Sequence, residues 1–569
     1  MTRSHHLLLT VAACFLFAAA ASAGTAPSIP ARFQAAPVGV QAYPEPPRSL
    51  DAAVAPAAVL ERAAVAEPES LAEMMRWNAA ANEPRQNGFS RSLGAPIHAS
   101  FSGVSVASAV DARVWNGRVT VGGAYRLRLR LDHVNLPAGT ILWVGGRGQK
   151  PIGFGLDLVD AEGGLWTPAA EGDTINLEVQ LPANAAGAGT FDMTSVLELV
   201  GGIQPTDAPV CLVDASCVND LQWGNGLDAR SAVAQLQFVK DGGSYVCSGG
   251  LLNDKNSSGT PYLLTANHCF STSSSASSLE AYWDYKTPNC NGSIPSFGAL
   301  QRSVGAQLLA TSATSDFTFV QLSSVPGNRT MLGWDASAQN GGMVLYRISF
   351  PFPDGAAQPF PASFSTTTLN TTRSTCTGRD RPNFRYSDQG RGGVYGGSSG
   401  SPVMTSDGAV LGQLLGSCGA DPSAGCDVRN ATVDGSFAVS YSSIQQWLQG
   451  GNPVTPTTCS PSTTNVCLVN NRFKVSMTYN GANMQATPFT GGNTGLFSQT
   501  SDPSNIEVLL KMIDACGFNA KFWVYSGGTT DQGIAITVVD TKTGTTKTYT
   551  NPKSTKFQTI TDASAFNCP

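Results

Sequence analysis

The sequence GGSSGSPV at residues 396–403 is the stretch from which the fold of this chain can be argued. A serine with glycines on both sides and a proline close behind is poorly suited to a helix or to the interior of a strand. It suits a tight turn whose backbone amides stay free, which is what an activated serine beside an anion-binding turn requires. A flexible Gly/Ser loop is the alternative interpretation of the same composition. The rest of the sequence has to distinguish the two.

The positions of the histidines help to distinguish an activated serine from a flexible loop. The chain has 5 histidines, of which two stand at the N-terminus and two, His98 and His133, lie in a region without cysteines. His268 is the sole histidine after residue 133. If Ser399 is activated by an imidazole of its own domain, that imidazole belongs to His268. A lone histidine beside a strand is otherwise a structural residue.

The order of these residues excludes one class of enzyme. GGSSG at 396–400 also fits the G-x-S-x-G nucleophile elbow of α/β-hydrolases, whose order is Ser, Asp, His. No histidine follows residue 268, so the elbow interpretation fails. The order His, Asp, Ser is that of the chymotrypsin group.

Two motifs carry a resemblance to a known family. TANHC at 265–269 resembles the T-A-x-H-C motif of chymotrypsin-fold serine proteases, and GSSGSP at 397–402 is similar to their G-D-S-G-G-P. The chain also resembles the bacterial lysyl endopeptidases from Cys211 through the Cys217 segment, at YWDY 282–285 and at TSDFT 314–318. The resemblance spans roughly residues 95–450. It implies an all-β fold, with a double six-stranded antiparallel β-barrel protease domain and a short C-terminal helix.

The resemblance also implies roles for individual residues. His268 is the general base, Asp316 orients its ring, and Ser399 is the nucleophile. The backbone amides of Gly397 and Ser399 form the oxyanion hole. Ser398 stands where most of these enzymes have an aspartate that pairs with a freed N-terminus. Inhibition before maturation must then come from the region in front of the protease domain.

The specificity pocket departs from the family. Lysyl endopeptidases have a histidine where this chain has Leu415, and their pocket aspartate aligns nearer Thr432 than Asp434. An aspartate before a glycine is otherwise an ordinary turn residue. In addition, no Lys or Arg occurs from 151 to 229, which includes the expected junction before Cys211. The resemblance favours Lys at P1, the pocket residues argue against it, and the sequence leaves P1 open.

Composition indicates an exported protein. Charged residues make up 13% of the chain, glycine is abundant at 60, and the net charge is -5, as in secreted β-rich proteins. Arg3, the apolar run 7–20 and the small residues 21–23 are typical of a secretory signal. We expect a secreted, extracellular monomer that acts on protein or peptide substrates. No basic stripe and no later membrane span is found in the sequence, so nucleic-acid and membrane partners are not expected. The site that the resemblance implies needs neither a metal nor a cofactor, and none is expected.

The cysteines and the linkers divide the chain. All cysteines except Cys14 fall between Cys211 and Cys568. We expect a signal peptide at 1–23, a β-rich pro-region at 24–205, the protease domain at 206–450, a Pro/Thr linker at 451–466 and a β-rich accessory domain at 467–569. The Ala/Pro-rich residues 24–60 are expected to be poorly ordered. Cysteine pairing within the protease domain follows from the resemblance: Cys247–Cys269, Cys217–Cys290, Cys211–Cys418 and Cys376–Cys426, with Cys418 and Cys426 able to exchange roles. The C-terminal cysteines are expected to pair among themselves.

Local patterns support a β-rich chain with one terminal helix. Strict alternation at 125–131 and 175–181 predicts strands with one apolar face in a small sandwich. Short strands are expected at 232–239, 262–265, 317–322, 410–415 and 534–538. Ile444, Trp447 and Leu448 share a helical face, with Ser442 or Ser443 as the cap. The prediction is a secreted serine endopeptidase. The alternatives are an inactive protease fold that serves in binding or adhesion, and an esterase.

Overall fold

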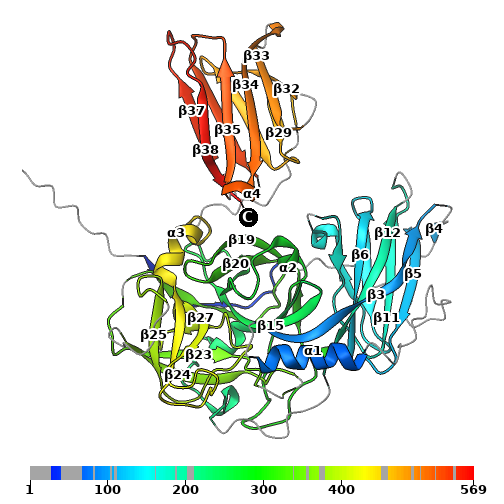
Figure 1. Ribbon diagram of the computed structural model, residues 1–569, viewed down its shortest axis with the longest axis vertical. Coiled ribbons are helices and arrows are strands. Elements are labelled where there is room, and N and C mark those ends of the chain that lie inside the picture. Colours follow the sequence, from blue (N-terminus) through cyan, green and yellow to red (C-terminus); the bar gives the residue numbers. More distant parts are fainter. Residues whose placement is uncertain are drawn as a thin grey trace, which may run out of the picture.

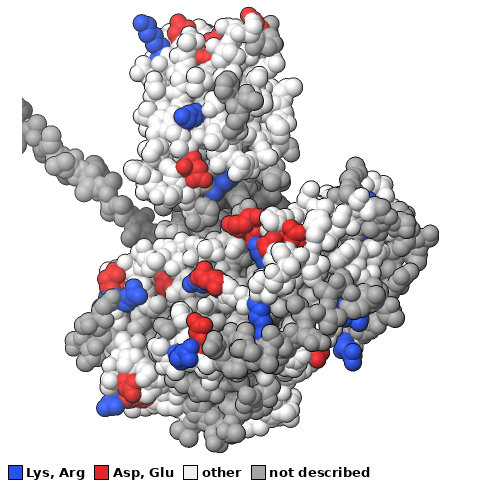
Figure 2. Space-filling model, turned by 45° about the vertical axis from the view of Figure 1, so that its right-hand side comes forward, with Lys and Arg blue, Asp and Glu red and all other residues white. Residues whose placement is uncertain are grey.

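A computed structural model places three β-rich units along the chain (Figure 1). Among the described residues, no helix is long and apolar enough to span a bilayer. On the face drawn in Figure 2, charged side chains lie scattered over a mostly uncharged surface. The structure describes residues 27–39, 67–80, 84–102, 106–107, 112–160, 162–185, 189–201, 211–337, 339–353, 356, 358–370, 379–449, 459, 461–488, 492–499, 502–519, 521–541 and 546–568. The expected signal peptide lies outside them.

The second barrel of the central unit is a closed ring of antiparallel strands. Its order is β27-β26-β23-β24-β25-β28, and β28 pairs back onto β27. The strands are β23 (Val344–Ser349), β24 (Ser363–Asn370), β25 (Phe384–Gln389), β26 (Pro402–Met404), β27 (Ala409–Cys418) and β28 (Ala431–Ser436). Short strands β13 (Val213–Asp214) and β22 (Gly333–Asp335) extend its sheet at β24 and β27.

The first barrel is built from the preceding strands. β15 pairs with both β14 and β16. On one side of it the order continues from β16 to β20 and β19, and on the other side from β14 to β17 and β18. Only Gly305 separates β18, which pairs with β17, from β19, which pairs with β20; the two segments count as one strand, and the sheet curls round as a six-stranded barrel. Its strands are β14 (Val233–Lys240), β15 (Gly243–Leu252), β16 (Tyr262–Ala266), β17 (Glu280–Tyr282), β18 (Arg302–Val304), β19 (Ala306–Ser312) and β20 (Phe317–Leu322). A one-turn helix, α2 (Ser273–Ser277), precedes β17. The double-barrel fold expected from the sequence is confirmed.

The front unit is a sandwich of two sheets, as the alternating segments indicate. One sheet has the order β10-β6-β12-β3 and the other β4-β5-β11-β7-β8. Leu127, Leu129 and Leu131 point into the shared core together with the apolar side of β11. The elements are α1 (Glu67–Ala79), β3 (Arg85–Ser100), β4 (Val106–Ala107), β5 (Ala112–Thr120), β6 (Arg126–Asn135), β7 (Ile141–Gly145), β8 (Ile152–Phe154), β9 (Leu165–Trp166), β10 (Ala170–Glu171), β11 (Thr174–Pro182) and β12 (Thr190–Leu199).

This sandwich and the first barrel share one sheet. β3 pairs antiparallel with the start of β15, from Gly243 opposite Phe89 to Val246 opposite Arg85. The pairing joins the strands of both units into a 12-stranded sheet. Every residue of β15 is buried, since the barrel core covers one face and the partner strand protects the edge.

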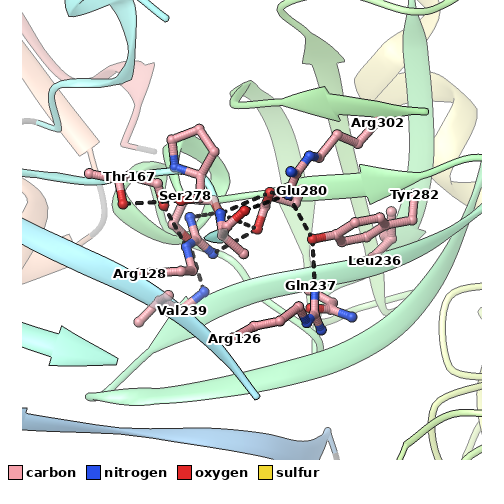
Figure 3. Close-up of polar contacts among 12 residues, drawn as sticks. Arg126, Arg128, Thr167, Leu236, Gln237, Val239, Ser278, Glu280, Tyr282 and Arg302 are labelled. Atoms are coloured by element: carbon pink, nitrogen blue, oxygen red, sulfur yellow. Dashed lines mark hydrogen bonds and ion pairs between the residues drawn. The ribbon is translucent and has the colours of Figure 1, made fainter. Parts of the chain in front are cut away.

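Buried arginines of β6 reach into the barrel unit (Figure 3). Arg126 donates to the Tyr282 hydroxyl at 2.9 Å and to Gln237 at 3.0 Å. Arg128 donates to the Ser278 carbonyl at 2.8 Å and lies 3.8 Å from the Glu280 carboxylate. These are the polar positions of the alternating segment, whose second face is therefore covered by protein rather than by water.

Two expectations from the sequence are wrong: the disorder of residues 27–39 and the start of the terminal helix. Residues 27–39, expected to be poorly ordered, form β1 (Ser28–Ile29) and β2 (Arg32–Gln34) against the barrel unit, because their backbone finds strand partners there. The terminal helix α3 (Phe437–Leu448) starts well before Ser442, directly after β28, and no side chain caps it. Its face of Ile444, Trp447 and Leu448 is buried as expected.

The disulfides agree with the expected pairing in the alternative in which Cys418 and Cys426 exchange roles. Cys217–Cys290 and Cys247–Cys269 are formed. Cys211 pairs with Cys426, not with Cys418, because its Cα lies 5.5 Å from that of Cys426. Cys418 is disulfide-bonded as well, and Cys376 lies outside the described residues. The C-terminal cysteines pair as Cys459–Cys467 and Cys516–Cys568, within their own unit as predicted.

The C-terminal unit is a second sandwich around its own apolar core. Its sheets have the orders β29-β30-β36-β37, with β31 on β30, and β32-β33-β34-β35-β38. The elements are β29 (Asn465–Leu468), β30 (Phe473–Tyr479), β31 (Ala482–Asn483), β32 (Gln485–Pro488), β33 (Thr494–Gln499), β34 (Asp502–Ala515), α4 (Cys516–Asn519), β35 (Lys521–Gly528), β36 (Ile534–Asp540), β37 (Thr546–Asn551) and β38 (Ile560–Asn567).

Candidate active site

His268 and Asp316 are brought together by a strand pair of the first barrel. β16 and β20 run antiparallel, with Ala266 opposite Phe317, so the residues just beyond their paired ends meet. The His268 Nδ1 lies 2.8 Å from Asp316 Oδ2, and the His268 backbone N–H donates to Asp316 Oδ1 at 2.9 Å. One carboxylate therefore fixes both the ring and the backbone of the histidine.

Asp316 is held from the second barrel. It is 4% exposed and has a φ of 51°, a left-handed conformation that a residue other than glycine adopts rarely. The Gln413 side chain on β27 donates to the carbonyls of Ser315 and Asp316, at 2.7 and 3.1 Å. These bonds fix the strained turn, so the carboxylate has little freedom to leave the imidazole.

The Ser399 turn packs against the strand that ends at His268. Gly400 has a φ of +80°, and a Cβ there would lie 2.9 Å from the Ala266 nitrogen. The Ser399 carbonyl accepts a hydrogen bond from the Ser248 backbone N–H at 2.8 Å, and the Ser248 hydroxyl donates to the Gly397 carbonyl at 2.9 Å. The turn thus sits at the joint between the barrels, fixed to β15 and close to the end of β16.

The amides of this turn are free in the way an oxyanion hole requires. Among the described residues, neither the Gly397 nor the Ser399 backbone N–H donates to a protein acceptor. Gly397 has a φ of +86°, and a Cβ there would approach the Phe350 carbonyl to 2.8 Å. Only glycine fits that position. The neighbouring Ser398 side chain is fully buried, and its hydroxyl has no partner within the described part of the chain.

The three predicted pocket residues do not form one group. Thr432 and Asp434 share a face of β28, where the Thr432 hydroxyl donates to Asp434 Oδ2 at 3.2 Å. Leu415 packs instead against the other face, with Ala431 and Val433. Asp434 is completely buried and forms an ion pair of 2.5 Å with Arg347, a residue that sequence reasoning missed.

Arg347 links this carboxylate to the nucleophile turn. Its guanidinium also donates to the Ser401 carbonyl at 2.9 Å and to the Ser401 hydroxyl at 3.0 Å. The signal in the sequence was an arginine inside the apolar strand VLYRIS, 344–349. Gln413 in the apolar strand VLGQLL, 410–415, gave the same kind of signal. A polar residue on the inner face of a barrel strand requires a buried partner.

This geometry defines a class of protein: a double-barrel fold of the chymotrypsin type, with its histidine, aspartate and serine at the joint of the barrels. Residues 206–432 match the family described as "Lysyl endopeptidase, C-terminal domain". The resemblance of the central part of the chain to lysyl endopeptidases is thereby confirmed.

Comparisons with individual proteins include one lysyl endopeptidase. The chain is 28% identical to a lysyl endopeptidase of Pseudomonas aeruginosa over 314 residues, which is 52% of this chain and 65% of the relative. It is 33% identical to "Secreted RxLR effector protein 73" of Plasmopara viticola over 218 residues, 37% of this chain and 50% of that one. The chain thus spans half to about two thirds of these relatives. A solved structure, a scabies mite inactivated protease paralogue, matches with a TM-score of 0.29 at 14% identity, over 38% of this chain and 94% of that chain.

Proposed function

We propose that this protein is a secreted serine endopeptidase that hydrolyses peptide bonds through an acyl-enzyme. The observation that carries the proposal is the 2.8 Å contact between His268 Nδ1 and a buried carboxylate of Asp316, beside the Ser399 turn. A buried aspartate on Nδ1 leaves Nε2 as the nitrogen that exchanges protons with a serine. The family match of residues 206–432 supports the same activity.

The residues act in sequence. The Ser399 Oγ attacks the scissile carbonyl while His268 Nε2 takes the hydroxyl proton, and Asp316 stabilises the imidazolium. The oxyanion accepts hydrogen bonds from the Gly397 and Ser399 amides. As the intermediate collapses, His268 gives the proton to the leaving amine and the acyl group stays on Ser399. Water, deprotonated by His268, then releases the acid and restores the serine.

The proposal is tested by two adjacent alanine variants. Ser399→Ala is expected to lower the kcat for peptide hydrolysis about 10⁴-fold or more, because the nucleophile is lost. Ser398→Ala is the matched control, since it removes a hydroxyl from the neighbouring position, and it is expected to keep kcat within about threefold. Equal activity of Ser399→Ala and the unaltered protein would favour the alternative, a protease fold that only binds or adheres.

We further propose that P1 is an uncharged residue rather than Lys. Leu415 and Thr432 offer no charge, and the Asp434 carboxylate is already paired with Arg347. Drawing Asp434 towards a substrate lysine would leave a buried guanidinium unpaired, at about 3–5 kcal/mol. The lack of Lys and Arg at 151–229 supports the same preference, because a basic-specific enzyme has no site for self-cleavage there.

Cleavage of a proteome-derived peptide mixture tests the P1 proposal. The expected profile lacks Lys and Arg at P1, and Asp434→Asn is expected to leave the profile unchanged. A strong Lys preference that disappears in Asp434→Asn would contradict the proposal, since it would make Asp434 the P1 anchor.

The front sandwich supports synthesis as a pre-pro-enzyme. β3 reaches Val246, next to Cys247, whose disulfide partner adjoins His268. Helix α1 and the segment beginning at Phe352 line a cleft of about 390 Å³, and the Phe352 N–H donates to the Gly396 carbonyl at 2.5 Å. Helix α1 of the front unit is thus separated from the Gly396 carbonyl by the Phe352 segment. We propose that from this position the front unit hinders the approach of a polypeptide to Ser399.

The precursor proposal predicts the composition of the active species. Intact mass measurement of the active protein is expected to find a new N-terminus close before Cys211 and no residues of the sandwich, 85–201. Full hydrolytic activity in a chain that still carries 85–201 covalently would contradict it.

A further inference from the structure

Residues 27–39 form a strap, defined here as the segment that crosses the barrel unit through the short strands β1 and β2 and a single bridge at Val38. These three pairings with residues 325–335 are antiparallel and keep the same register, from Ser28 opposite Asp335, through Phe33 opposite Thr330, to Val38 opposite Val325. In Figure 1 the dark blue segment runs across the barrel unit.

Backbone hydrogen bonds hold the strap along its length. Val38 and Val325 exchange both bonds, at 3.0 and 2.8 Å, and the Asn328 N–H donates to the Ala35 carbonyl at 3.0 Å. The Asn253 side chain donates to the Pro30 carbonyl at 3.1 Å. These are bonds of a sheet and of a specific side chain, not of a loose surface contact.

The barrel unit carries glycines where the strap approaches. A Cβ on Gly327 would lie 2.4 Å from the Ala35 carbonyl oxygen, and one on Gly333 would lie 2.3 Å from that of Ile29. Neither glycine has a positive φ, so backbone conformation does not require glycine at either position. The close approach of the strap is the physical reason for both.

The strap also contacts the apolar cores of both barrels. Ile29 packs against the core that contains Trp334 and Phe437, and Val38 packs against the first-barrel core. β21 (Arg329–Met331) and β22 belong to the connection between the barrels. Because His268 and Asp316 come from the first barrel and Ser399 from the second, the strap spans the same joint as the candidate active site.

From these contacts we propose that the strap stays bound to the barrel unit after the sandwich has been removed. The mature enzyme is then a two-chain molecule, with the N-terminal strap as a retained strand. The inference rests on the proposed precursor processing, and it requires a second cut between the strap and helix α1. The surface formed by Gly327, Gly333, Asn253 and β21 is the binding site of this segment of the same chain.

The test separates retention from catalysis. A full-length Ser399→Ala chain receives recognition sequences for a foreign site-specific protease in place of residues 50–56 and 203–208. Both sites are cut, and the products are separated by size exclusion at physiological salt. The strap peptide is expected to co-elute with the barrel unit, as mass spectrometry of the peak detects. A strap peptide that elutes free would overturn the proposal, and neither result depends on Ser399 chemistry.

Variants on both sides of the contact sharpen the test. Gly333→Ala is expected to release the strap, whereas Gly224→Ala, where a Cβ meets nothing within 4 Å, is the matched control and retains it. Ile29→Asp on the strap is expected to release it without altering the barrel unit, so misfolding of Gly333→Ala cannot decide the outcome. Retention of the Ile29→Asp strap at the unaltered level would also overturn the proposal.

Discussion

In the proposed mechanism Asp316 keeps the His268 ring in one tautomer, because only then does Nε2 face a serine as an acceptor. Asp316→Asn places an amide against Nδ1 and favours the wrong tautomer. We expect kcat to fall about 10³–10⁴-fold with the fold intact. Steady-state kinetics on a peptide substrate measures this. The exposed Asp407→Asn serves as the control, and a loss below tenfold in Asp316→Asn would argue against the assigned role.

We expect the pH dependence of the contact between the front sandwich and the barrel unit to depend mainly on Glu280. Burial alone would raise the pKa of this carboxyl, but Arg302, Arg128 and Arg126 outweigh it, so its pKa lies below the usual value. Arg302 belongs to the barrel unit, whereas Arg128 and Arg126 come from the sandwich, so only part of this lowering depends on sandwich binding. That part favours the bound sandwich while Glu280 is ionised and is lost as the pH falls through the lower pKa of the complex.

Acidification is accordingly expected to release the sandwich. The dissociation constant is measured between pH 6 and pH 3 on the Ser399→Ala chain cut between sandwich and barrels. It should rise towards the acid end, and less steeply in Glu280→Gln. Identical pH profiles for Glu280→Gln and the unaltered chain would contradict the role of this carboxylate. Glu507→Gln, in the C-terminal sandwich, is the control.

At the scale of elements, helix α3 packs against a core to which both barrels contribute residues. Ile444 is fully buried among Trp334, Phe319 and their neighbours. Ile444→Ala is expected to destabilise the barrel unit by about 2–5 kcal/mol, through lost burial and the cavity left behind. Thermal unfolding followed by calorimetry measures the loss. Gln445→Ala, on the exposed side of the helix, should change stability by less than about 0.5 kcal/mol.

Sequence patterns predicted those elements whose reason is local. β6, β11 and the buried face of α3 follow from alternation or helical spacing alone, and β20 was expected as a short strand between loops. The start of α3 was missed because β28 runs into it without a turn residue or a cap. The strap was missed because strands as short as β1 and β2 exist only through the edge they join. Composition carries no information about such an edge.

The same limit applies to the candidate site: features with a local signal could be predicted, and contacts between distant residues could not. Chain order and two motifs pointed to His268 and Ser399, and the resemblance at 314–318 pointed to Asp316. The structure brings His268 and Asp316 together, and their catalytic roles stay a proposal. The Arg347–Asp434 pair joins residues 87 positions apart, and no local pattern connects them. The burial of Arg126 and Arg128 was not predictable for the same reason, because alternation shows that a face is polar but not what covers it.

At the scale of the whole molecule, the sandwich is attached to the barrels by a strand pair and by buried charges. Truncating one partner of a buried, hydrogen-bonded charge contact costs about 2–5 kcal/mol of binding. Arg128→Gln is thus expected to weaken sandwich binding about 30-fold or more in the cut chain. Arg118→Gln, whose bond to Asn176 stays within the sandwich, is the control and should leave the dissociation constant unchanged. Equal effects of the two variants would mean that the buried charges do not hold the units together.

The central claim is that Ser399 is an activated nucleophile, and covalent labelling tests it most directly. The barrel unit, freed of the sandwich, is treated with a phosphonofluoridate, and the adduct is mapped by peptide mass spectrometry. The account predicts one adduct, on Ser399, that is absent in Ser399→Ala and strongly slowed in His268→Ala. A folded barrel unit whose Ser399 stays unmodified under conditions that label trypsin-like enzymes completely would contradict it.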